Sequence, residues 1–352
     1  MAPYLQESNA PASPEANDIK ASVKSAPKKI LSYEPGRTVA ETHENYPYEH
    51  LLPTFPDVKW EPLKEVPYHD KGIDGSPTFD ALLSTATSIR DYNPKIGTEV
   101  EGIDLANITD AQKNDIARLI ATRGVVFFRN QKNFDIEAQR KLGKYFGHLR
   151  NPTPSYTSLK LLSGPPSGGG GNTLWSSQYA AYDALSPAMQ TYLSSLSALH
   201  SADMQAADSI RGNRPVRRDP VTTIHPLIRV NPVTGWKSLF FNPGFVTKIV
   251  GVPKLESDFL ISYLNEVIAT TNEIHVSFEW GRDDVAFWDN RICNHSATYG
   301  FAPHRRHAVR VATQAEKPYY SADGKSQEEE LNAKYGLPAG NKDCSGVGNY
   351  ND

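Results

Sequence analysis

Residues 288–313 constrain the possible structure and chemistry of this chain more than any other stretch. They read WDNRICNHSATYGFAPHRRHAVRVAT, in which Arg306 follows His295 by eleven positions and Arg310 follows it by fifteen. Side chains an even number of positions apart share one face of a strand. If residues 309–311 form a strand, Arg306 and Arg310 are expected to face one side, away from His307 and Val309. The stretch therefore predicts one imidazole and two guanidinium groups at a common site.

These residue types suit one class of metal chemistry. Fe(II) oxygenases bind iron through two histidines and one carboxylate, and leave adjacent coordination positions open. A keto acid such as 2-oxoglutarate takes two of these positions, and its far carboxylate is well matched by a bidentate guanidinium. The two other protein ligands normally come from a His-x-Asp or His-x-Glu pair, yet none of the ten histidines of this chain begins such a pair. Taken singly, a lone histidine or an arginine in a strand is more often structural, so the prediction depends on the combined pattern.

Several ordered segments indicate a family. The chain resembles the taurine/alkanesulfonate and 2,4-dichlorophenoxyacetate dioxygenase family (TauD/TfdA), in particular its fungal sulfonate dioxygenases. The segments that carry the resemblance, besides that of His295, are IGTEVEGIDL (96–105), LIATRGVVFFRNQ (119–131), KLGKYFGHL (141–149), PSYTSLKLLSGPPSGGGGNTLWSS (154–177), LSALHSAD (196–203) and TGWKSLFFNPGF (234–245).

The resemblance implies a role for five residues. His295 matches the distal ligand of Fe(II), while Arg306 and Thr173 match the residues that hold the far carboxylate of 2-oxoglutarate. Arg310 matches the arginine that binds the anionic head of the substrate in sulfonate-using members. Phe240 falls, more loosely, where an aromatic side chain lines the substrate pocket. The implied cofactors are Fe(II) and 2-oxoglutarate.

The chain also departs from the family pattern. Asn172 and Gly300 stand where the family usually has Asp. A larger departure lies at residues 150/151, where the family's segment with the His-x-Asp ligands is missing and the sequence resumes at once in register. Such sharp edges favour a skipped exon, an alternative transcript or an incomplete gene model over gradual decay of the site.

Two other histidines are candidate replacement ligands. His148 lies at the junction, and His200 is spaced three residues from Asp203. A three-residue step puts side chains on opposite faces of a strand, so His200 and Asp203 would share a face only on a helix. The family match places both outside the metal site.

Two hypotheses about function follow. The first is an Fe(II)- and 2-oxoglutarate-dependent dioxygenase acting on a small anionic substrate, a taurine-like sulfonate from which sulfite is released, with this chain inactive for lack of two iron ligands. The second is a non-catalytic protein that binds anions or 2-oxoglutarate through Thr173, Arg306 and Arg310. Four consecutive glycines at 168–171 are compatible with a phosphate cradle, but no Gly-Lys-Ser/Thr follows them, so a P-loop is not predicted.

Composition agrees with an enzyme of the cytosol. A chain of 352 residues with 39% hydrophobic content can bury a substantial core. Its net charge of -3 gives no field that attracts nucleic acid or anionic membrane. Two cysteines, Cys293 and Cys344, cannot form a disulfide framework and suggest a reducing compartment. No apolar stretch has the length of a membrane span or a signal peptide. The oligomeric state is left open, a homo-oligomer included.

The order of elements predicts a mainly β fold with flanking α-helices. Helices are expected at residues 110–124, 135–147 and 186–200, with Asp110 and Ser186 as N-caps, and short strands through most of the rest. Together with the resemblance this predicts a double-stranded β-helix core of jelly-roll, cupin-like type. The expected division is a disordered segment at 1–30, an irregular arm at 31–78, the dioxygenase domain at 79–320 and a polar, mobile tail at 321–352.

Overall fold

The computed structural model describes residues 31–34, 37–40, 46–54, 56, 58–62, 65–149, 154–301 and 304–336. The chain divides into two compact units, residues 1–58 with 213–215 and residues 59–212 with 216–352. In the described part of the first unit, β1 (Leu31–Glu34) pairs antiparallel with β2 (Arg37–Ala40), and η1 (Glu49–Leu51) is one 3-10 turn. Residues 1–30, expected to be disordered, lie outside the described residues. All candidate site residues lie in the second unit.

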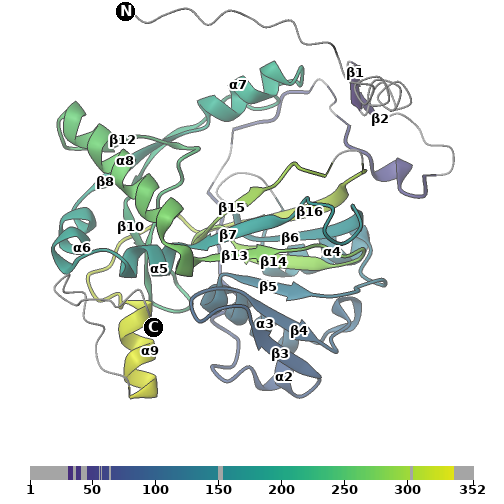
Figure 1. The fold of residues 1–352 in the computed structure, drawn as a ribbon, viewed down its shortest axis with the longest axis horizontal. Coiled ribbons are helices and arrows are strands. Elements are labelled where there is room, and N and C mark those ends of the chain that lie inside the picture. The colour runs from purple at the N-terminus through teal and green to yellow at the C-terminus, as the bar shows by residue number, and fades with distance from the viewer. Residues whose placement is uncertain are drawn as a thin grey trace, which may run out of the picture. The chain divides into compact units, whose positions relative to one another are not determined.

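A six-stranded sheet forms the centre of the second unit (Figure 1). Its order is β16-β6-β14-β5-β4-β3, and every neighbouring pair is antiparallel except β4 with β5. The strands are β3 (Ser88–Asp91), β4 (Thr98–Glu101), β5 (Val125–Phe128), β6 (Pro154–Ser163), β14 (Val285–Asp289) and β16 (His307–Gln314).

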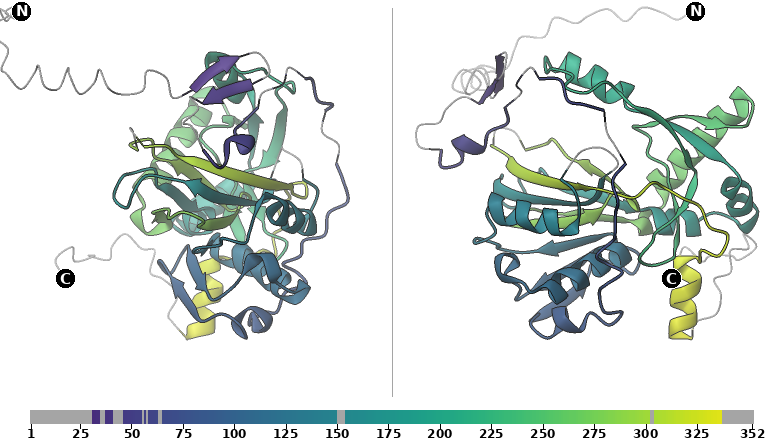
Figure 2. Two further views of the ribbon diagram at one scale, coloured as in Figure 1. Left: turned by 90° about the vertical axis from the view of Figure 1, so that its right-hand side faces the viewer. Right: turned by 180° about the vertical axis from the view of Figure 1, so that it is seen from behind.

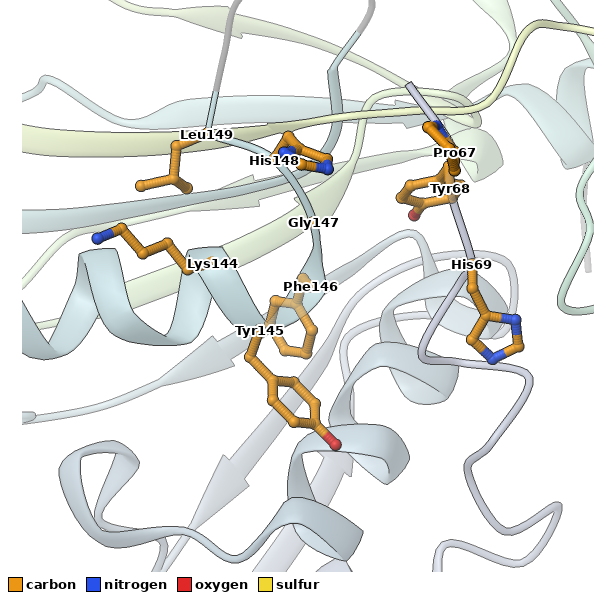
Figure 3. A pocket seen from close by; sticks show the side chains of 9 residues that line it. All are labelled: Pro67, Tyr68, His69, Lys144, Tyr145, Phe146, Gly147, His148 and Leu149. Carbon is orange, nitrogen blue, oxygen red and sulfur yellow. The ribbon is translucent and has the colours of Figure 1, made fainter. Parts of the chain in front are cut away.

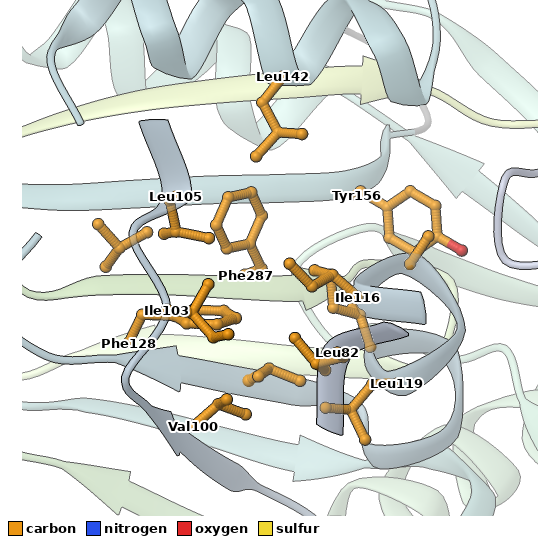
Figure 4. Packing of buried hydrophobic residues seen from close by; sticks show 14 of the residues in the cluster. Leu82, Val100, Ile103, Leu105, Ile116, Leu119, Phe128, Leu142, Tyr156 and Phe287 are labelled. Atoms are coloured by element: carbon orange, nitrogen blue, oxygen red, sulfur yellow. The ribbon is translucent and has the colours of Figure 1, made fainter. Parts of the chain in front are cut away.

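Helices cover one face of this sheet. Because strand side chains alternate between faces, Phe128 and Phe287 point to a cluster shared with Leu82, Leu119 and Leu142 of the helices (Figure 4). The helices are α2 (Asp80–Leu83), α3 (Asp110–Arg123) and α4 (Ile136–Phe146). The N-cap of α3 is Thr109 rather than the predicted Asp110: its hydroxyl accepts from the Gln112 amide, and the Gln112 side chain accepts from the Thr109 amide.

The opposite face packs against a second sheet of order β13-β7-β15. Trp175 of that sheet has its ring centroid 5.5 Å from that of Phe127 and 5.7 Å from that of Trp288, both of the six-stranded sheet. Phe278 stacks on Phe127 at 4.1 Å. These aromatic contacts fill the space between the two sheets, where the candidate site also lies. The strands are β7 (Thr173–Ser177), β13 (His275–Phe278) and β15 (Cys293–Ala297).

The remaining elements extend the second unit (Figure 2). A third sheet has the order β12-β8-β9, and β10 pairs with β11. The elements are α5 (Gln178–Asp183), α6 (Pro187–Ser194), β8 (Ser197–Ser201), α7 (Asp203–Arg211), β9 (Thr222–Pro226), β10 (Ile228–Val230), β11 (Lys237–Leu239), β12 (Val246–Val250), α8 (Lys254–Thr270) and α9 (Gln327–Tyr335), with short 3-10 turns η2 (Leu105–Asn107) and η3 (Asn272–Ile274). None of the helices in the described ranges has the length and apolarity to cross a membrane.

Two sequence predictions differ from this structure. The helix expected over residues 186–200 begins as predicted with Ser186 as its cap, but α6 ends at Ser194 and the chain continues as β8. Pairing on both edges, with β12 and β9, fixes that strand. The polar tail expected from residue 321 contains α9, because Ser326 caps the helix and donates to Asp183. Residues 337–352 lie outside the described part.

Two strands near the candidate site form sheet edges. In the described part of the chain, β16 pairs only with β6 and β15 pairs only with β7. An edge strand presents a row of unpaired backbone groups. One edge of each of the two facing sheets is therefore formed by a strand that carries a candidate site residue, His295 in β15 and Arg310 in β16.

Candidate functional site

A cavity of about 340 Å³ brings together three of the five predicted site residues, His295, Arg310 and Phe240. His295 pairs with Trp175 across β15 and β7, so its side chain shares the face on which Trp175 packs between the sheets. Arg310 pairs with Leu159, whose side chain packs against the same cluster. Register in the two facing sheets thus directs the imidazole and the guanidinium into one space.

The environment of His295 keeps its ring neutral. The ring is accessible to solvent in the cavity and lies 4.9 Å from the ring of Trp288, while the surrounding walls remove most of its hydration. This desolvation, assisted by the nearby charge of Arg310, lowers the pKa of His295 to about 4. A neutral imidazole is the form that binds metals.

Arg310 is a charged side chain that has no ion-pair partner among the described residues. Burial by the cavity walls lowers its pKa, but an arginine remains charged at neutral pH. Within the described residues it forms no ion pair with a carboxylate, in contrast to buried Arg291. An anion entering the cavity would therefore meet an unpaired guanidinium, as the family match predicts for the head of a sulfonate.

Arg306 and Thr173 lie together, but they do not line the same cavity. Arg306 donates from Nε to the carbonyl of Gly171 at 3.0 Å and from Nη2 to the Thr173 hydroxyl at 3.4 Å. The Thr173 oxygen also accepts from Trp280 Nε1 at 3.0 Å. Because both lone pairs of the Thr173 hydroxyl oxygen already accept hydrogen bonds, the hydroxyl proton is available to donate to a carboxylate. Arg306 Nη1 is available in the same way.

The glycine run that precedes β7 makes room for Arg306. Gly171 has φ +77°, and a Cβ built there would lie 3.2 Å from Arg306 Cδ. Gly170 has φ +79°, and its Cβ would lie 2.4 Å from the Gly300 carbonyl oxygen. Positive φ and close approach are both conditions that favour glycine. The run thus serves contact with the β15–β16 connection.

We expect Gly171→Ala to weaken 2-oxoglutarate binding at least fivefold, because the added methyl group displaces the Arg306 side chain. Gly168→Ala is a matched control, since Gly168 has φ +76° but nothing within 4 Å of its Cβ position. Both changes should cost stability, about 1–3 kcal/mol each, through backbone strain. Calorimetric titration measures binding and thermal unfolding measures stability. Equal binding losses in both variants would contradict a specific role for Gly171.

The structure adds two histidines that the sequence did not assign to the site. His200 of β8 and His225 of β9 line the cavity with Phe240, and the three ring centroids lie 5.1–5.8 Å apart. Burial, then the neighbouring His225, lowers the pKa of His200 to about 4. Burial, then Arg229 and Lys317, lowers the pKa of His225. The sequence offers His200 only as a candidate metal ligand, and His225 lies in no recognisable motif. The two histidines come together because β8 pairs with β9.

The residues that the structure describes do not fit an iron site. Within the described residues, no three His, Cys, Asp or Glu side chains lie close enough together to hold a metal ion. His148 lines a different cavity of about 500 Å³ with Pro67, Tyr68 and His69 (Figure 3), and that lining shares no residue with the cavity of His295. Asp203 lies exposed in the first turn of α7 and does not line the cavity. His295 therefore lacks, among the described residues, the further ligands that a facial triad needs.

A buried ionic cluster supports the cavity floor. Arg291 lies 2.6 Å from Asp70, 2.7 Å from Asp289 and 2.8 Å from Glu316, measured between nitrogen and oxygen. Burial alone would lower the pKa of Arg291, but these carboxylates hold it well above its ordinary value. Next to it, Asn290 donates to Ser155 O and to Thr157 Oγ1, both at 2.8 Å. Both residues line the cavity of His295, and these ion pairs and hydrogen bonds fix the orientation of their side chains.

Comparisons of sequence and structure with known proteins all indicate one family of dioxygenases. The profile described as "Taurine catabolism dioxygenase TauD, TfdA family" matches residues 88–160 and 149–312. A protein of Schizosaccharomyces pombe assigned as an alpha-ketoglutarate-dependent sulfonate dioxygenase is 36% identical over 334 aligned positions, with 82% of this chain and 85% of that protein covered. The alpha-ketoglutarate-dependent sulfonate dioxygenase of Saccharomyces cerevisiae is 33% identical, with 78% of this chain and 79% of that protein covered. The crystal structure of a taurine dioxygenase from Burkholderia xenovorans is 26% identical, with a TM-score of 0.58, and the match covers 68% of this chain and 94% of that one.

The family match is divided into two pieces at the junction. The two pieces of the family match meet at residues 149–160, directly after α4. The 334 positions aligned with the Schizosaccharomyces pombe protein also exceed 82% of a chain of 352 residues, so the alignment contains gaps on the side of this chain. The position of the division agrees with a segment missing near residues 150/151, and the gaps agree with residues missing from this chain.

Proposed function

Because the chain belongs to the TauD/TfdA family of 2-oxoglutarate-dependent dioxygenases, we propose that its site is built for oxidation of a small sulfonate with release of sulfite. The observation that carries the proposal is the placement of four cooperating residues between two facing sheets. Arg306 lies beside Thr173, and Arg310 shares a cavity with His295. Two separate cation sites suit two anionic reactants.

Different residues of the chain would bind 2-oxoglutarate and the sulfonate. Arg306 Nη1 and the Thr173 hydroxyl would donate to the far carboxylate of 2-oxoglutarate, and Gly171 holds the arginine in place. Arg310 would pair with the sulfonate head, while Phe240 borders the space for its carbon chain. Charge-assisted hydrogen bonds in a desolvated cavity are the strong ones, so these contacts would fix both reactants in position.

The missing segment explains why binding residues are present without a metal site. We infer that the facing sheets are the two halves of a jelly roll, and that the absent segment would add its strands and its His-x-Asp ligands beside β15 and β16. Both strands have an unpaired edge in the described part of the chain, and His295 and Arg310 lie on them. The family activity therefore belongs to the complete site, and this chain retains its anion-binding part.

A second candidate function is anion binding without turnover. The absence of any three-residue metal cluster from the described residues favours it for the chain as it stands. In that case Thr173, Arg306 and Arg310 would bind 2-oxoglutarate or a sulfonate as ligands only.

Two arginine variants test the proposed division of roles. Arg306→Ala should weaken 2-oxoglutarate binding at least tenfold, because a lost charge-assisted partner costs about 1.5–3 kcal/mol. Arg310→Ala should instead weaken sulfonate binding and leave 2-oxoglutarate nearly unchanged. Calorimetric titration of each variant with each ligand measures both effects. If Arg310→Ala abolishes 2-oxoglutarate binding while Arg306→Ala has no effect, the two roles are assigned wrongly.

A further inference from the structure

The cavity of about 340 Å³ has an uneven distribution of charge. Arg310 supplies an unpaired positive charge from β16. None of the described residues that line the cavity is acidic; besides arginines and histidines, they are apolar or neutral side chains such as Val221, Leu239 and Phe245. An anionic head group is thus matched, but a positive charge elsewhere on the same ligand has no carboxylate to pair with.

The wall formed by His200, His225 and Phe240, here called the ring wall, is also unsuited to a cation. Both imidazoles are neutral at neutral pH, since their pKa values lie below the ordinary value. A phenyl face can attract an ammonium group. However, the guanidinium of Arg229 already lies 5.0 Å from the centroid of the Phe240 ring. Arg229 is fully buried and paired with Glu316, so a guanidinium already lies over the ring that a second cation would need.

Neutral oxygen atoms in the lining supply no counter-charge, and two of them are already engaged in hydrogen bonds. The Thr223 hydroxyl is engaged with His225 Nε2 at 2.8 Å, and Ser201 Oγ accepts from the Asp203 amide at 3.1 Å. An ammonium group placed against the ring wall would lose its hydration without gaining a counter-charge, which is costly. A carbon chain without charge loses nothing comparable, and gains from contact with the apolar lining.

We propose that this cavity takes organosulfonates whose carbon chain is uncharged, and that it selects against sulfonates that end in an ammonium group. The inference rests on the proposed sulfonate site at Arg310 and narrows its substrate class. It makes aminoalkanesulfonates such as taurine poor ligands of this cavity.

The test is a calorimetric titration of the full chain with butane-1-sulfonate and 4-aminobutane-1-sulfonate, which share the head group and the chain length. We expect butane-1-sulfonate to bind at least tenfold more tightly. Ethane-1-sulfonate should bind more weakly than butane-1-sulfonate by about fourfold per methylene removed, as expected when the chain enters an apolar space.

A variant that adds a negative charge to the cavity lining tests whether the preference arises from the charge of that lining. Gln205 lines the cavity from α7 and is exposed, so Gln205→Glu adds a carboxylate there without burying it in the core. It should reduce the preference for butane-1-sulfonate at least threefold. Ala207→Glu is the matched control: it adds the same charge on the same helix at an exposed position outside the cavity lining, and should leave the preference unchanged.

The outcomes separate the inference from the proposed function. Equal or tighter binding of 4-aminobutane-1-sulfonate, reduced by Arg310→Ala, would overturn the inference and leave the sulfonate site intact. An equal change of preference in Gln205→Glu and Ala207→Glu would also overturn it, because the selection would not arise in the cavity. Failure of both sulfonates to bind, or binding that Arg310→Ala does not affect, would overturn the sulfonate site itself and the inference with it.

Discussion

Insertion of a relative's segment carrying the His-x-Asp pair between Arg150 and Asn151 is expected to raise sulfonate-dependent turnover at least about a hundredfold over the unmodified chain. Loss of residues that only support metal ligands already costs about 10–100-fold in affinity or activity. Here the described residues contain no group of three His, Cys, Asp or Glu side chains that could hold the metal. Oxygen uptake and succinate formation, with added Fe(II) and 2-oxoglutarate, measure the gain.

The control for this experiment is the same insertion with the His and Asp of the pair both changed to Ala. It restores the length of the chain and its strand pairing but not the ligands, so it should remain at background. Robust turnover by the unmodified chain would contradict the prediction, because it would require ligands outside the described residues or a rearrangement of those within them.

Arg291→Ala is expected to lower the free energy of unfolding by about 3–5 kcal/mol, which is a large part of the stability of most domains. The variant would leave Asp70, Asp289 and Glu316 close together in the interior without their shared cation. Denaturant unfolding followed by circular dichroism measures the change.

Arg211→Ala provides a comparison, because the pair of Arg211 with Asp208 is exposed on α7 and such surface pairs contribute about 0–1 kcal/mol. A loss for Arg291→Ala no larger than that for Arg211→Ala would mean that the buried cluster does not hold the unit together. A variant that fails to fold at all agrees with the expectation if the Arg211 variant folds normally.

Some helices and strands could be predicted because their caps and apolar runs lie within the segment itself. The helix over α4 was expected from Asp135 to Gly147, and the structure confirms it with Asp135 as N-cap and Gly147 as C-cap. The strand at β5 was equally clear from its run of apolar residues. The helix expected through His200 was wrong over its second half, because pairing with β9 and β12 is a tertiary contact that no local pattern records.

The site was predictable in its residue types but not in its geometry. Simple alternation put Arg306 and Arg310 on one face of a strand. In the structure β16 begins after Arg306, and its register with β6 shifts between His307 and Ala308, so the alternation does not extend back to residue 306. Arg310 consequently lines the cavity of His295, while Arg306 contacts Thr173. The separation of the two cations depends on that irregularity, which the sequence alone does not reveal.

The open edge of β16 gives Arg310 a second effect. The strand runs AVRVAT over residues 308–313, a composition that favours pairing with another chain, and Arg310 is its permanently charged residue. Charged residues within apolar edge strands act as gatekeepers against aggregation. Arg310→Ala therefore removes a gatekeeper together with an anion site, and its solutions should aggregate at lower concentrations than those of Arg310→Lys. Solubility at this edge is thus tied to the same side chain that recognises the ligand.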